Sequence, residues 1–331
     1  MNRPHQTVRP RRLVPRIPWG HGMNGLRDGI VLLGYTGGWS AVRHLPERAA
    51  YALFRRIADE AWRRRGPSVK RLEANLSRAL GTTDEDALRE ASRAGMRSYL
   101  RYWCEAFRLP DWDRRRVLER IRVEGEHNMR DPLASGRGAV AALPHMANWD
   151  HAGAWGCLTG ARVTTVAERL QPERLFERFV AYREGLGMEI LPLTGGANDV
   201  FVTLADRLKQ GRLVPLLADR DISRRGIEVN LFGEATRMPA GPAALAMRTG
   251  AALLPVTLWY EGDEPDHTLV VRFHEDVPPP QGIRGSARVV HMTQAVADKF
   301  SAGIAEHPED WHMLQPLFLA DLADGRSRAR P

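Results

Sequence analysis

The residues best suited to chemistry lie in one short segment, PHMANWD at 144–150. It follows an apolar run, GAVAAL at 138–143, which has the length of a buried strand, and a helical pattern starts after Trp149. In α/β proteins, active sites collect in the loops at the carboxyl ends of sheet strands. His145 and Asp150 are therefore candidate catalytic residues.

The chemistry that His145 and Asp150 could perform is general base catalysis. We expect the Asp150 carboxylate to reach back across the turn and accept a hydrogen bond from His145 Nδ1. This bond would fix the tautomer and leave Nε2 free to take a proton. The pair would be the base half of a catalytic triad without a protein nucleophile, so the nucleophile would be a hydroxyl group of the substrate. The other interpretation is a structural histidine at the end of a strand.

Other catalytic classes lack their motifs. Asp150-His151 resembles part of a zinc site, but Met146 and Asn148 occupy the positions where a metallo-hydrolase of the H-x-H-x-D-H type needs its first ligands. The sequence contains no G-x-S-x-G nucleophile elbow, no Walker A loop and no G-x-G-x-x-G after a strand. Serine hydrolysis, nucleotide hydrolysis and dinucleotide redox chemistry are therefore disfavoured.

The segments that must position this site alternate between short apolar runs and helical patterns. The expected strands lie at 138–143, 162–167, 188–193, 212–218, 228–232, 252–260 and 268–274. The expected helices follow Trp149, begin near 172, 198 and 239, and span about 286–307. Such alternation predicts an α/β fold, a central and mostly parallel sheet with helices on both faces.

The domain organisation predicted from these patterns is simple. A single domain at 23–320 would consist of a mainly helical part at 23–130, with one helix at 84–108, and an α/β core at 131–320. A flexible basic arm is expected at 1–22, where Pro, Arg and Gly recur without apolar period, and a tail at 321–331.

Positive charge is concentrated in the N-terminal third. Residues 1–130 carry 27 basic and 15 acidic side chains, a net charge of +12, whereas the rest of the chain has a net charge of −4. Such a basic region attracts phosphate in nucleic acid or in anionic lipid headgroups. The basic runs at 63–65 and 114–116 lie in no known nucleic-acid-binding module, so we expect an anionic membrane surface as the partner and no nucleic acid.

Aromatic residues accompany the arginines between 25 and 65. Aromatic residues beside arginine are typical of helices that lie in a bilayer interface. The same helices could instead pack on their own domain, and the sequence leaves both possibilities open. The residues concerned are Tyr35, Trp39, Tyr51, Phe54 and Trp62.

Neither a signal peptide nor a membrane-spanning helix is expected. The best candidate for a spanning segment, at 29–41, is too short and too rich in glycine to cross a bilayer, and arginine and proline interrupt the N-terminus. Cys104 and Cys157 form no metal-ligand spacing and are expected to be small buried hydrophobic residues. No metal and no cofactor are predicted.

Three blocks resemble a known family. They are PHMANWD, the segment LLADRDISRRGIEVNLFGEATRMPAGPAALAMRTGAALLPV at 216–256, and HPEDWHMLQPLF at 307–318. Together they resemble the lipid A biosynthesis acyltransferase family, a branch of the H-x-x-x-x-D acyltransferases of glycerolipid metabolism. Within it, the likeness is closest to the actinobacterial enzymes that acylate phosphatidylinositol mannosides. It covers roughly residues 25–320.

The resemblance implies roles for particular residues. His145 matches the catalytic base and Asp150 its partner, and Asp219 matches an acidic residue beside the histidine. Two further positions lining the site are matched by Glu168 and Arg183. The block from Phe232 to Arg248 would border the groove for the acyl donor, with Arg237 as a contact for the donor's phosphates.

The resemblance also implies a reaction. An acyl-CoA would donate a palmitoyl-like chain to the 6-hydroxyl of a mannose on phosphatidylinositol, at the cytoplasmic face of the plasma membrane. The alternatives are the same chemistry on a lipid A precursor or a lysophospholipid and, outside enzymes, a basic protein that binds nucleic acid.

Overall fold

The computed structural model describes residues 42–169, 173–193, 199–223 and 225–322. The arm expected at 1–22 and most of the tail expected at 321–331 lie outside the described residues, as do Tyr35 and Trp39.

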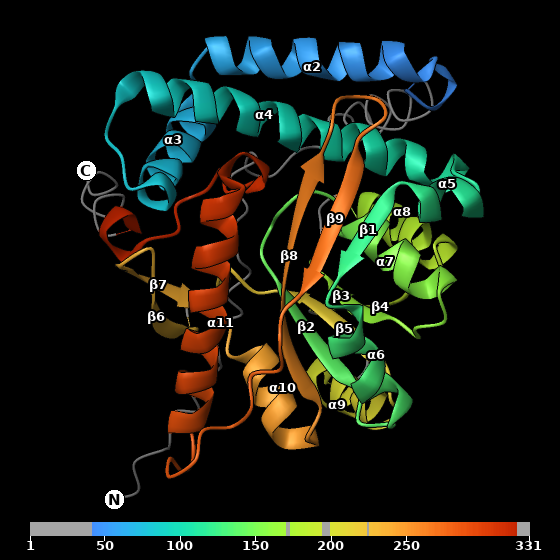
Figure 1. The fold of residues 1–331 in the computed structure, drawn as a ribbon, viewed down its shortest axis with the longest axis vertical. Helices are drawn as coiled ribbons and strands as arrows, with labels where there is room; N and C mark the ends of the chain where they lie inside the picture. The colour runs from blue at the N-terminus through green and yellow to red at the C-terminus, as the bar shows by residue number, and fades with distance from the viewer. Residues whose placement is uncertain (1–41, 170–172, 194–198, 224, 323–331) are drawn as a thin grey trace, which may run out of the picture.

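A five-stranded sheet forms the centre of the molecule, in the order β1-β9-β8-β2-β5 (Figure 1). Its strands are β1 (Ile121–Glu124), β2 (Ala139–Leu143), β5 (Leu213–Leu217), β8 (Ala252–Glu261) and β9 (Thr268–Phe273). Strand β2 is parallel to both β5 and β8, and β1 is parallel to β9, whereas β8 and β9 run antiparallel. The expected α/β class with a mostly parallel central sheet is confirmed.

Both faces of the sheet are covered at its centre. Every residue of β2 is buried, and so is every residue of β8 except Glu261. Because successive side chains of a strand point to opposite faces, complete burial requires layers on both sides. This explains why β2 reads as an unbroken apolar run in the sequence.

Two short strand pairs flank the main sheet. Strands β3 (Thr164–Ala167) and β4 (Glu189–Pro192) are parallel, and a bridge between Val163 and Leu213 joins β3 to β5. Strands β6 (Ile227–Leu231) and β7 (Glu234–Met238) form an antiparallel hairpin. Its turn, Phe232-Gly233, has positive φ at both residues, which a two-residue turn of this handedness requires.

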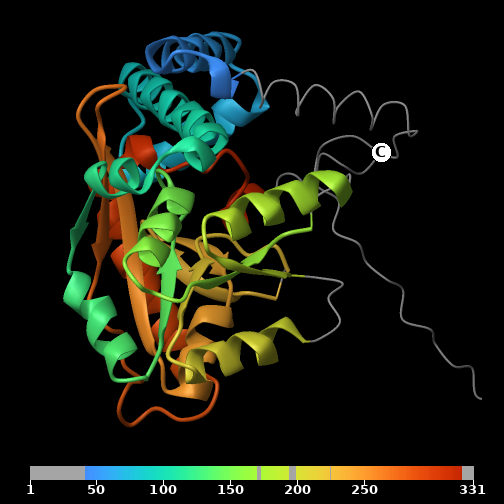
Figure 2. The same cartoon turned by 90° about the vertical axis from the view of Figure 1, so that its right-hand side faces the viewer.

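Helices of the core pack around these strands. In Figure 2, α8 and α9 extend from one side of the sheet. The core helices are α5 (Arg114–Glu119), α6 (Glu126–Ala134), α7 (Trp149–Leu158), α8 (Glu173–Gly185), α9 (Val200–Lys209), α10 (Gly241–Thr249) and α11 (Ala287–Glu306). Two single 3₁₀ turns lie at Leu109–Asp111 and Pro308–Asp310.

An N-terminal helical layer covers one end of the sheet. It consists of α2 (Glu47–Arg63), α3 (Pro67–Leu80) and α4 (Glu85–Arg108). The arrowhead of β8 points toward α4, which lies across this end (Figure 1). The start of α4 is capped by Asp84, whose carboxylate accepts a hydrogen bond from the Ala87 amide at 2.7 Å. The helix expected at 84–108 is thereby confirmed.

The aromatic residues of α2 pack inward. Tyr51 and Phe54 are buried against α4, and Trp62 donates from Nε1 to the Arg89 carbonyl and to Ser92 Oγ. For these three residues the intramolecular interpretation is correct. The membrane interpretation fails for Tyr51 and Phe54 because their apolar surface is covered by the protein's own helices. Trp62 is partly exposed, but its indole nitrogen is bound to α4.

Two strands were not predicted from the sequence. Strand β1 lies in the stretch expected to be mainly helical, and its four residues are too few to show an alternation. Strand β7, EATRM, is polar and half exposed, because only one of its faces packs on the domain.

Among the described residues, none of the helices is long and apolar enough to span a membrane.

Candidate active site

Strand register brings His145 together with Asp219. Strands β2 and β5 are parallel neighbours, and Leu143 lies opposite Leu217. His145 and Asp219 each stand two residues beyond these positions, at the same edge of the sheet. His145 Nδ1 lies 2.6 Å from Asp219 Oδ1, and the His145 amide donates to Asp219 Oδ2 at 3.0 Å.

The Asp219 carboxylate is fully buried and held ionised by hydrogen-bond donors. Burial alone would raise its pKa. The attraction to His145, the two hydrogen bonds from that residue and a third from Trp311 Nε1 at 3.0 Å outweigh burial and lower the pKa. A carboxylate is only an acceptor, so Nδ1 carries the proton of the neutral imidazole and Nε2 is left as the nitrogen that could accept a proton.

The expected hydrogen bond from His145 to Asp150 is not formed. Asp150 instead accepts from Arg183 Nε at 2.7 Å and from the Tyr102 hydroxyl at 3.1 Å. The five-residue spacing places Asp150 in the first turn of α7, where its side chain meets α4 and α8 rather than the imidazole. The pairing predicted from sequence is therefore wrong, and Asp219 takes that position.

The closing segment at 307–312 fixes the loop around His145. The His312 amide donates to the His145 carbonyl at 2.7 Å, and the Ala147 amide donates to the Asp310 carbonyl at 3.0 Å. Met146 forms a β-bridge with Trp311. These bonds hold Ala147 at φ 44°, a left-handed conformation that an alanine adopts only under such constraint.

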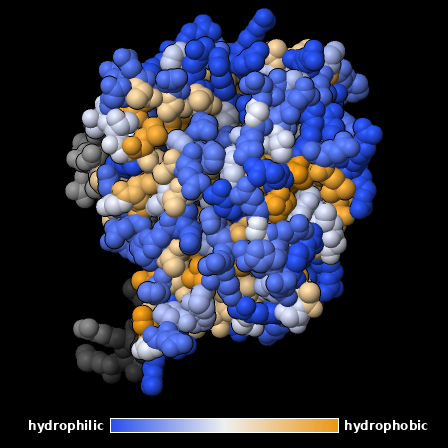
Figure 3. All heavy atoms as spheres, in the orientation of Figure 1, coloured by the Kyte–Doolittle hydropathy of each residue, from blue (hydrophilic) through white to orange (hydrophobic). Residues whose placement is uncertain are grey.

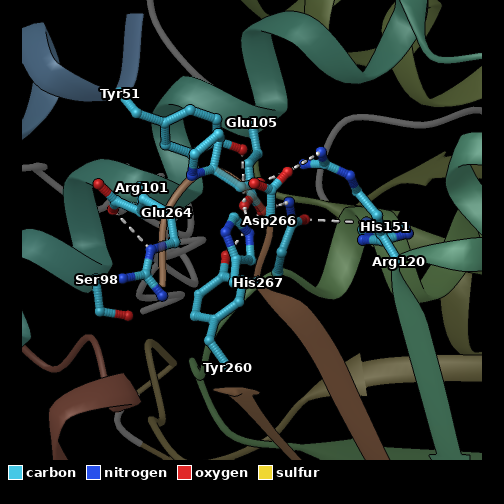
Figure 4. Close-up of polar contacts among 12 residues, drawn as sticks. Tyr51, Ser98, Arg101, Glu105, Arg120, His151, Tyr260, Glu264, Asp266 and His267 are labelled. Carbon is cyan, nitrogen blue, oxygen red and sulfur yellow. Dashed lines mark hydrogen bonds and ion pairs between the residues drawn. The ribbon is translucent and has the colours of Figure 1, made fainter. Parts of the chain in front are cut away.

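Asn148 connects this loop to the N-terminal helical layer. It caps α7, because its Oδ1 accepts from the His151 amide at 2.9 Å, and its Nδ2 donates to Glu105 Oε2 at 2.7 Å. Figure 4 shows Tyr51, Tyr260 and His267 gathered around Glu105. The Tyr260 hydroxyl donates to Oε2 at 2.9 Å, and His267 Nε2 is hydrogen-bonded to Oε1.

Glu105 remains charged although it is completely buried. Burial acts to raise its pKa, but His267 and the surrounding donors lower it to about 2. A buried carboxylate with this many partners is costly to break, so it is a firm anchor for Asn148.

A cavity of about 380 Å³ opens beside His145. Its lining is mainly apolar and comes largely from strands β2, β3, β5, β8 and β9 and from helices α9 and α10. Of the residues expected to lie at the site, His145, Asp150, Glu168 and Arg183 line the cavity. Its volume and apolar lining fall in the range of small-molecule binding sites.

Only part of the block at 232–248, which was expected to border the groove for the acyl donor, lies at the cavity. Pro239, Pro242 and Leu245 line the cavity. Arg237 is exposed on β7, where strand alternation turns it away from the buried neighbours Thr236 and Met238, and it is not among the lining residues.

Sequence reasoning missed Glu105, Tyr102 and Trp311. Glu105 and Tyr102 lie on α4, and no local sequence pattern indicates that these two side chains contact residues more than forty positions away. Trp311 stands in a block that carries the family resemblance, so its position was signalled but its contact with Asp219 was not.

The rival chemistry at Asp150-His151 is not supported. His151 Nε2 donates to the Val117 carbonyl at 2.9 Å, and burial lowers the pKa of its imidazole. Within the described ranges, no group of three or more candidate ligands could hold a metal ion. Burial raises the pKa of the Cys104 and Cys157 thiols, which disfavours thiolate nucleophiles.

Comparison with known proteins identifies the class to which this fold and site belong. A family model described as bacterial lipid A biosynthesis acyltransferase matches residues 23–320. Because the match spans most of the chain, the protein belongs to this family and is an O-acyltransferase. The resemblance found in the sequence is thereby confirmed.

Individual relatives narrow the likeness. The phosphatidylinositol mannoside acyltransferase of Mycolicibacterium smegmatis is 49% identical over 315 residues, covering 95% of this chain and 97% of that protein. Proteins of the same name from two strains of Mycobacterium tuberculosis are 46% identical over 295 residues, covering 88% of this chain and 90% of each relative.

Proposed function

We propose that this protein transfers a fatty acyl group from acyl-CoA to the 6-hydroxyl of a mannose on a phosphatidylinositol mannoside. The acceptor is inferred from relatives that carry that activity in their name and are similar over nearly the whole chain. The observation that supports the chemistry most directly is the contact of His145 Nδ1 with the buried Asp219 carboxylate.

In the proposed step, His145 Nε2 takes the proton of the acceptor hydroxyl while its oxygen attacks the thioester carbonyl. Asp219 stabilises the imidazolium that forms, as the aspartate does in the serine-protease template. The tetrahedral intermediate then expels the CoA thiolate, which takes the proton from the His145 imidazolium and leaves as the free thiol. The neutral base is restored and the new ester is released. The thiolate is a good leaving group, so the step requires neither a metal nor a redox cofactor.

The hydrogen-bond donors that stabilise the oxyanion are expected to lie outside the loop at 145–147, because the backbone amides of this loop already have acceptors. The amides of His145, Met146 and Ala147 already donate to Asp219, Pro144 and Asp310. The His151 amide donates to Asn148 Oδ1. An oxyanion hole built from these groups would require their present hydrogen bonds to break.

The apolar cavity would hold the acyl chain of the donor. It begins at His145 and is lined by small and aliphatic side chains of β2, β5 and α10, which suits a hydrocarbon. Arg237 remains a proposed contact for the donor's phosphates, on the exposed face of β7.

The acceptor is a membrane lipid, and we propose that the protein reaches it by docking peripherally on an anionic cytoplasmic leaflet. Leu53 and Ile57 of α2 are exposed by 42% and 45% and lie one helical turn apart. In the view of Figure 3 the surface over α2 is mainly hydrophilic, in agreement with the charged side chains that flank these two residues.

The proposal is tested with purified protein, palmitoyl-CoA and a panel of dispersed acceptors. The panel contains phosphatidylinositol mannosides, a lipid A precursor and a lysophospholipid, and both free CoA and product mass are followed. We expect product only with the mannosides. Product with the lipid A precursor or the lysophospholipid alone would overturn the acceptor, and CoA release without any acylated product would overturn transfer. If chelator abolished turnover, the metal-free mechanism would be wrong.

A further inference from the structure

Arg220 differs from the other partly buried arginines in the part of the chain that the structure describes. Those arginines have carboxylate or carbonyl partners, for example Arg183 with Asp150 and Arg212 with Glu189. Arg220 is half-buried, yet within the described ranges it takes part in no hydrogen bond, ion pair or ring contact. A guanidinium that lines a cavity and has no partner of its own is available to bind an anion that is not part of the protein.

The position of Arg220 puts that anion at the active site. It directly follows Asp219, the partner of His145, and lines the same cavity as His145. Consecutive Cα atoms are about 3.8 Å apart, so an arginine side chain at this position stays within a short reach of the reacting groups.

Neighbouring acidic groups do not neutralise Arg220. The carboxylate of Asp221 is engaged by the amides of Ser223 and Gly226 and by Ser223 Oγ. Asp150 is paired with Arg183, and Glu168, which lines the same cavity, forms no ion pair with Arg220.

We propose that Arg220 binds the phosphodiester of the acceptor headgroup. This inference rests on the proposed function. In the proposed substrates the only ionised groups are phosphates, because mannose and inositol are neutral. Guanidinium groups bind phosphate through paired charge-assisted hydrogen bonds.

The acceptor is the more suitable source of this phosphate. When the donor's thioester lies at His145, the whole pantetheine arm separates its phosphates from the reacting carbon. In the acceptor, a mannose and part of an inositol ring separate the attacking hydroxyl from the phosphodiester. Because Arg220 is next in sequence to Asp219, it lies close to the reacting atoms and is better placed to reach the nearer phosphate, which is the phosphodiester of the acceptor.

The experiment compares Arg220→Gln, Arg220→Lys and a control, Arg284→Gln, which removes an exposed charge before α11. Each variant is assayed with phosphatidylinositol mannoside and with a phosphate-free alkyl mannoside. We expect Arg220→Gln to lower kcat/KM for the phospholipid about ten- to a hundredfold, through KM, and to leave the KM for acyl-CoA unchanged. The lysine variant should be intermediate and the control unaffected. On the alkyl mannoside the loss should vanish.

Calorimetry with deacylated glycerophosphoinositol mannoside, without donor, gives a readout independent of turnover. The wild type should bind this headgroup, and Arg220→Gln should bind it at least tenfold more weakly. Equal binding, an equal loss on both acceptors, a rise in the KM for acyl-CoA, or a loss in kcat alone would overturn the inference. Failure of the proposed function would be recognised separately, because the wild type itself would then acylate no mannoside.

Discussion

Asp219 meets three donors with two oxygens, and this arrangement makes its chemical identity critical. His145 Nδ1 reaches Oδ1, while the His145 amide and Trp311 Nε1 both reach Oδ2. An asparagine has one accepting oxygen and one donating nitrogen. Its oxygen must face the two donors that cannot reverse, so its amide nitrogen would face Nδ1 and force the imidazole proton onto Nε2.

Asp219→Asn should therefore lower kcat by roughly 10⁴-fold, as tautomer reversal does in the serine-protease template. Circular dichroism should show an unchanged fold, and Asp263→Asn, an exposed carboxyl in the β8–β9 turn, serves as the control. In the proposed mechanism His145 and Asp219 act as one unit, so adding Asp219→Asn to His145→Ala should cost nothing further. Asp219→Asn with activity within tenfold of the wild type would remove this residue from the mechanism.

A different outcome is expected at Asp150, because its partner is Arg183. Asp150→Asn leaves a guanidinium that is 17% exposed without its counter-ion, at a cost of about 3–5 kcal/mol in the free energy of unfolding. Urea denaturation measures this loss, and activity per folded molecule should fall far less than in Asp219→Asn. If Asp150→Asn kept full stability and lost all activity, Asp150 would have to act on His145 directly.

Helix α7 and the loop before it depend on contacts from distant elements. Asn148 is held by Glu105 of α4, and the loop backbone is held by residues 310–312. His145 is thus placed by the end of a strand, a helix cap and two distant segments. Such support restricts the loop to one conformation and permits the positive φ of Ala147.

Glu105→Gln tests this support and predicts a dependence on pH. The wild-type pKa falls from an ordinary 4.5 to about 2 in the folded state, so the stability that the charge contributes is present above pH 4.5 and is lost as pH falls toward 2. The variant lacks this loss. At pH 7 the free energy of unfolding of Glu105→Gln should be about 3–5 kcal/mol lower than that of the wild type. This difference should shrink by roughly 3 kcal/mol as the pH falls from 4.5 to 2.

Denaturant titrations at several pH values measure this change, and Glu90→Gln, an exposed change on the same helix, is the control. A deficit that stays constant from pH 7 to pH 2 would mean that the pKa of Glu105 is the same in the folded and the unfolded protein. A deficit that widens as pH falls would mean that Glu105 is protonated in the folded protein.

At the scale of the whole molecule, the net charge of +12 over residues 1–130 should govern membrane docking. Each basic residue near an anionic surface contributes about 1 kcal/mol, screened by salt, whereas apolar burial is insensitive to salt. The protein should sediment with anionic vesicles at low salt, be released only partly at high salt, and bind neutral vesicles weakly.

Substitution of Leu53 and Ile57 by serine should remove the part of binding that resists salt. These substitutions avoid the inward face of α2, whereas deletion of residues 1–65 would uncover α4. Val290→Ser, on α11 and exposed by 43%, is the matched control. Equal binding to neutral and anionic vesicles at any salt concentration would rule out the basic region as the docking surface.

The sequence by itself determined the α/β class, most strands of the core, the helix at 84–108 and the position of His145 at a strand end. These features are local, because the apolar pattern of a strand and the cap of a helix are formed by residues that are neighbours in the sequence. It also carried the family, since three motif blocks lie along the chain in a specific order.

Only the tertiary structure decided which carboxylate contacts His145. Asp150 is five residues away and Asp219 seventy-four, but parallel pairing of β2 with β5 places the more distant residue opposite the imidazole. Strand order in a sheet is fixed by packing over the whole core, and local spacing does not record it. The same holds for Glu105, whose partners come from α2, the start of α7 and the β8–β9 hairpin.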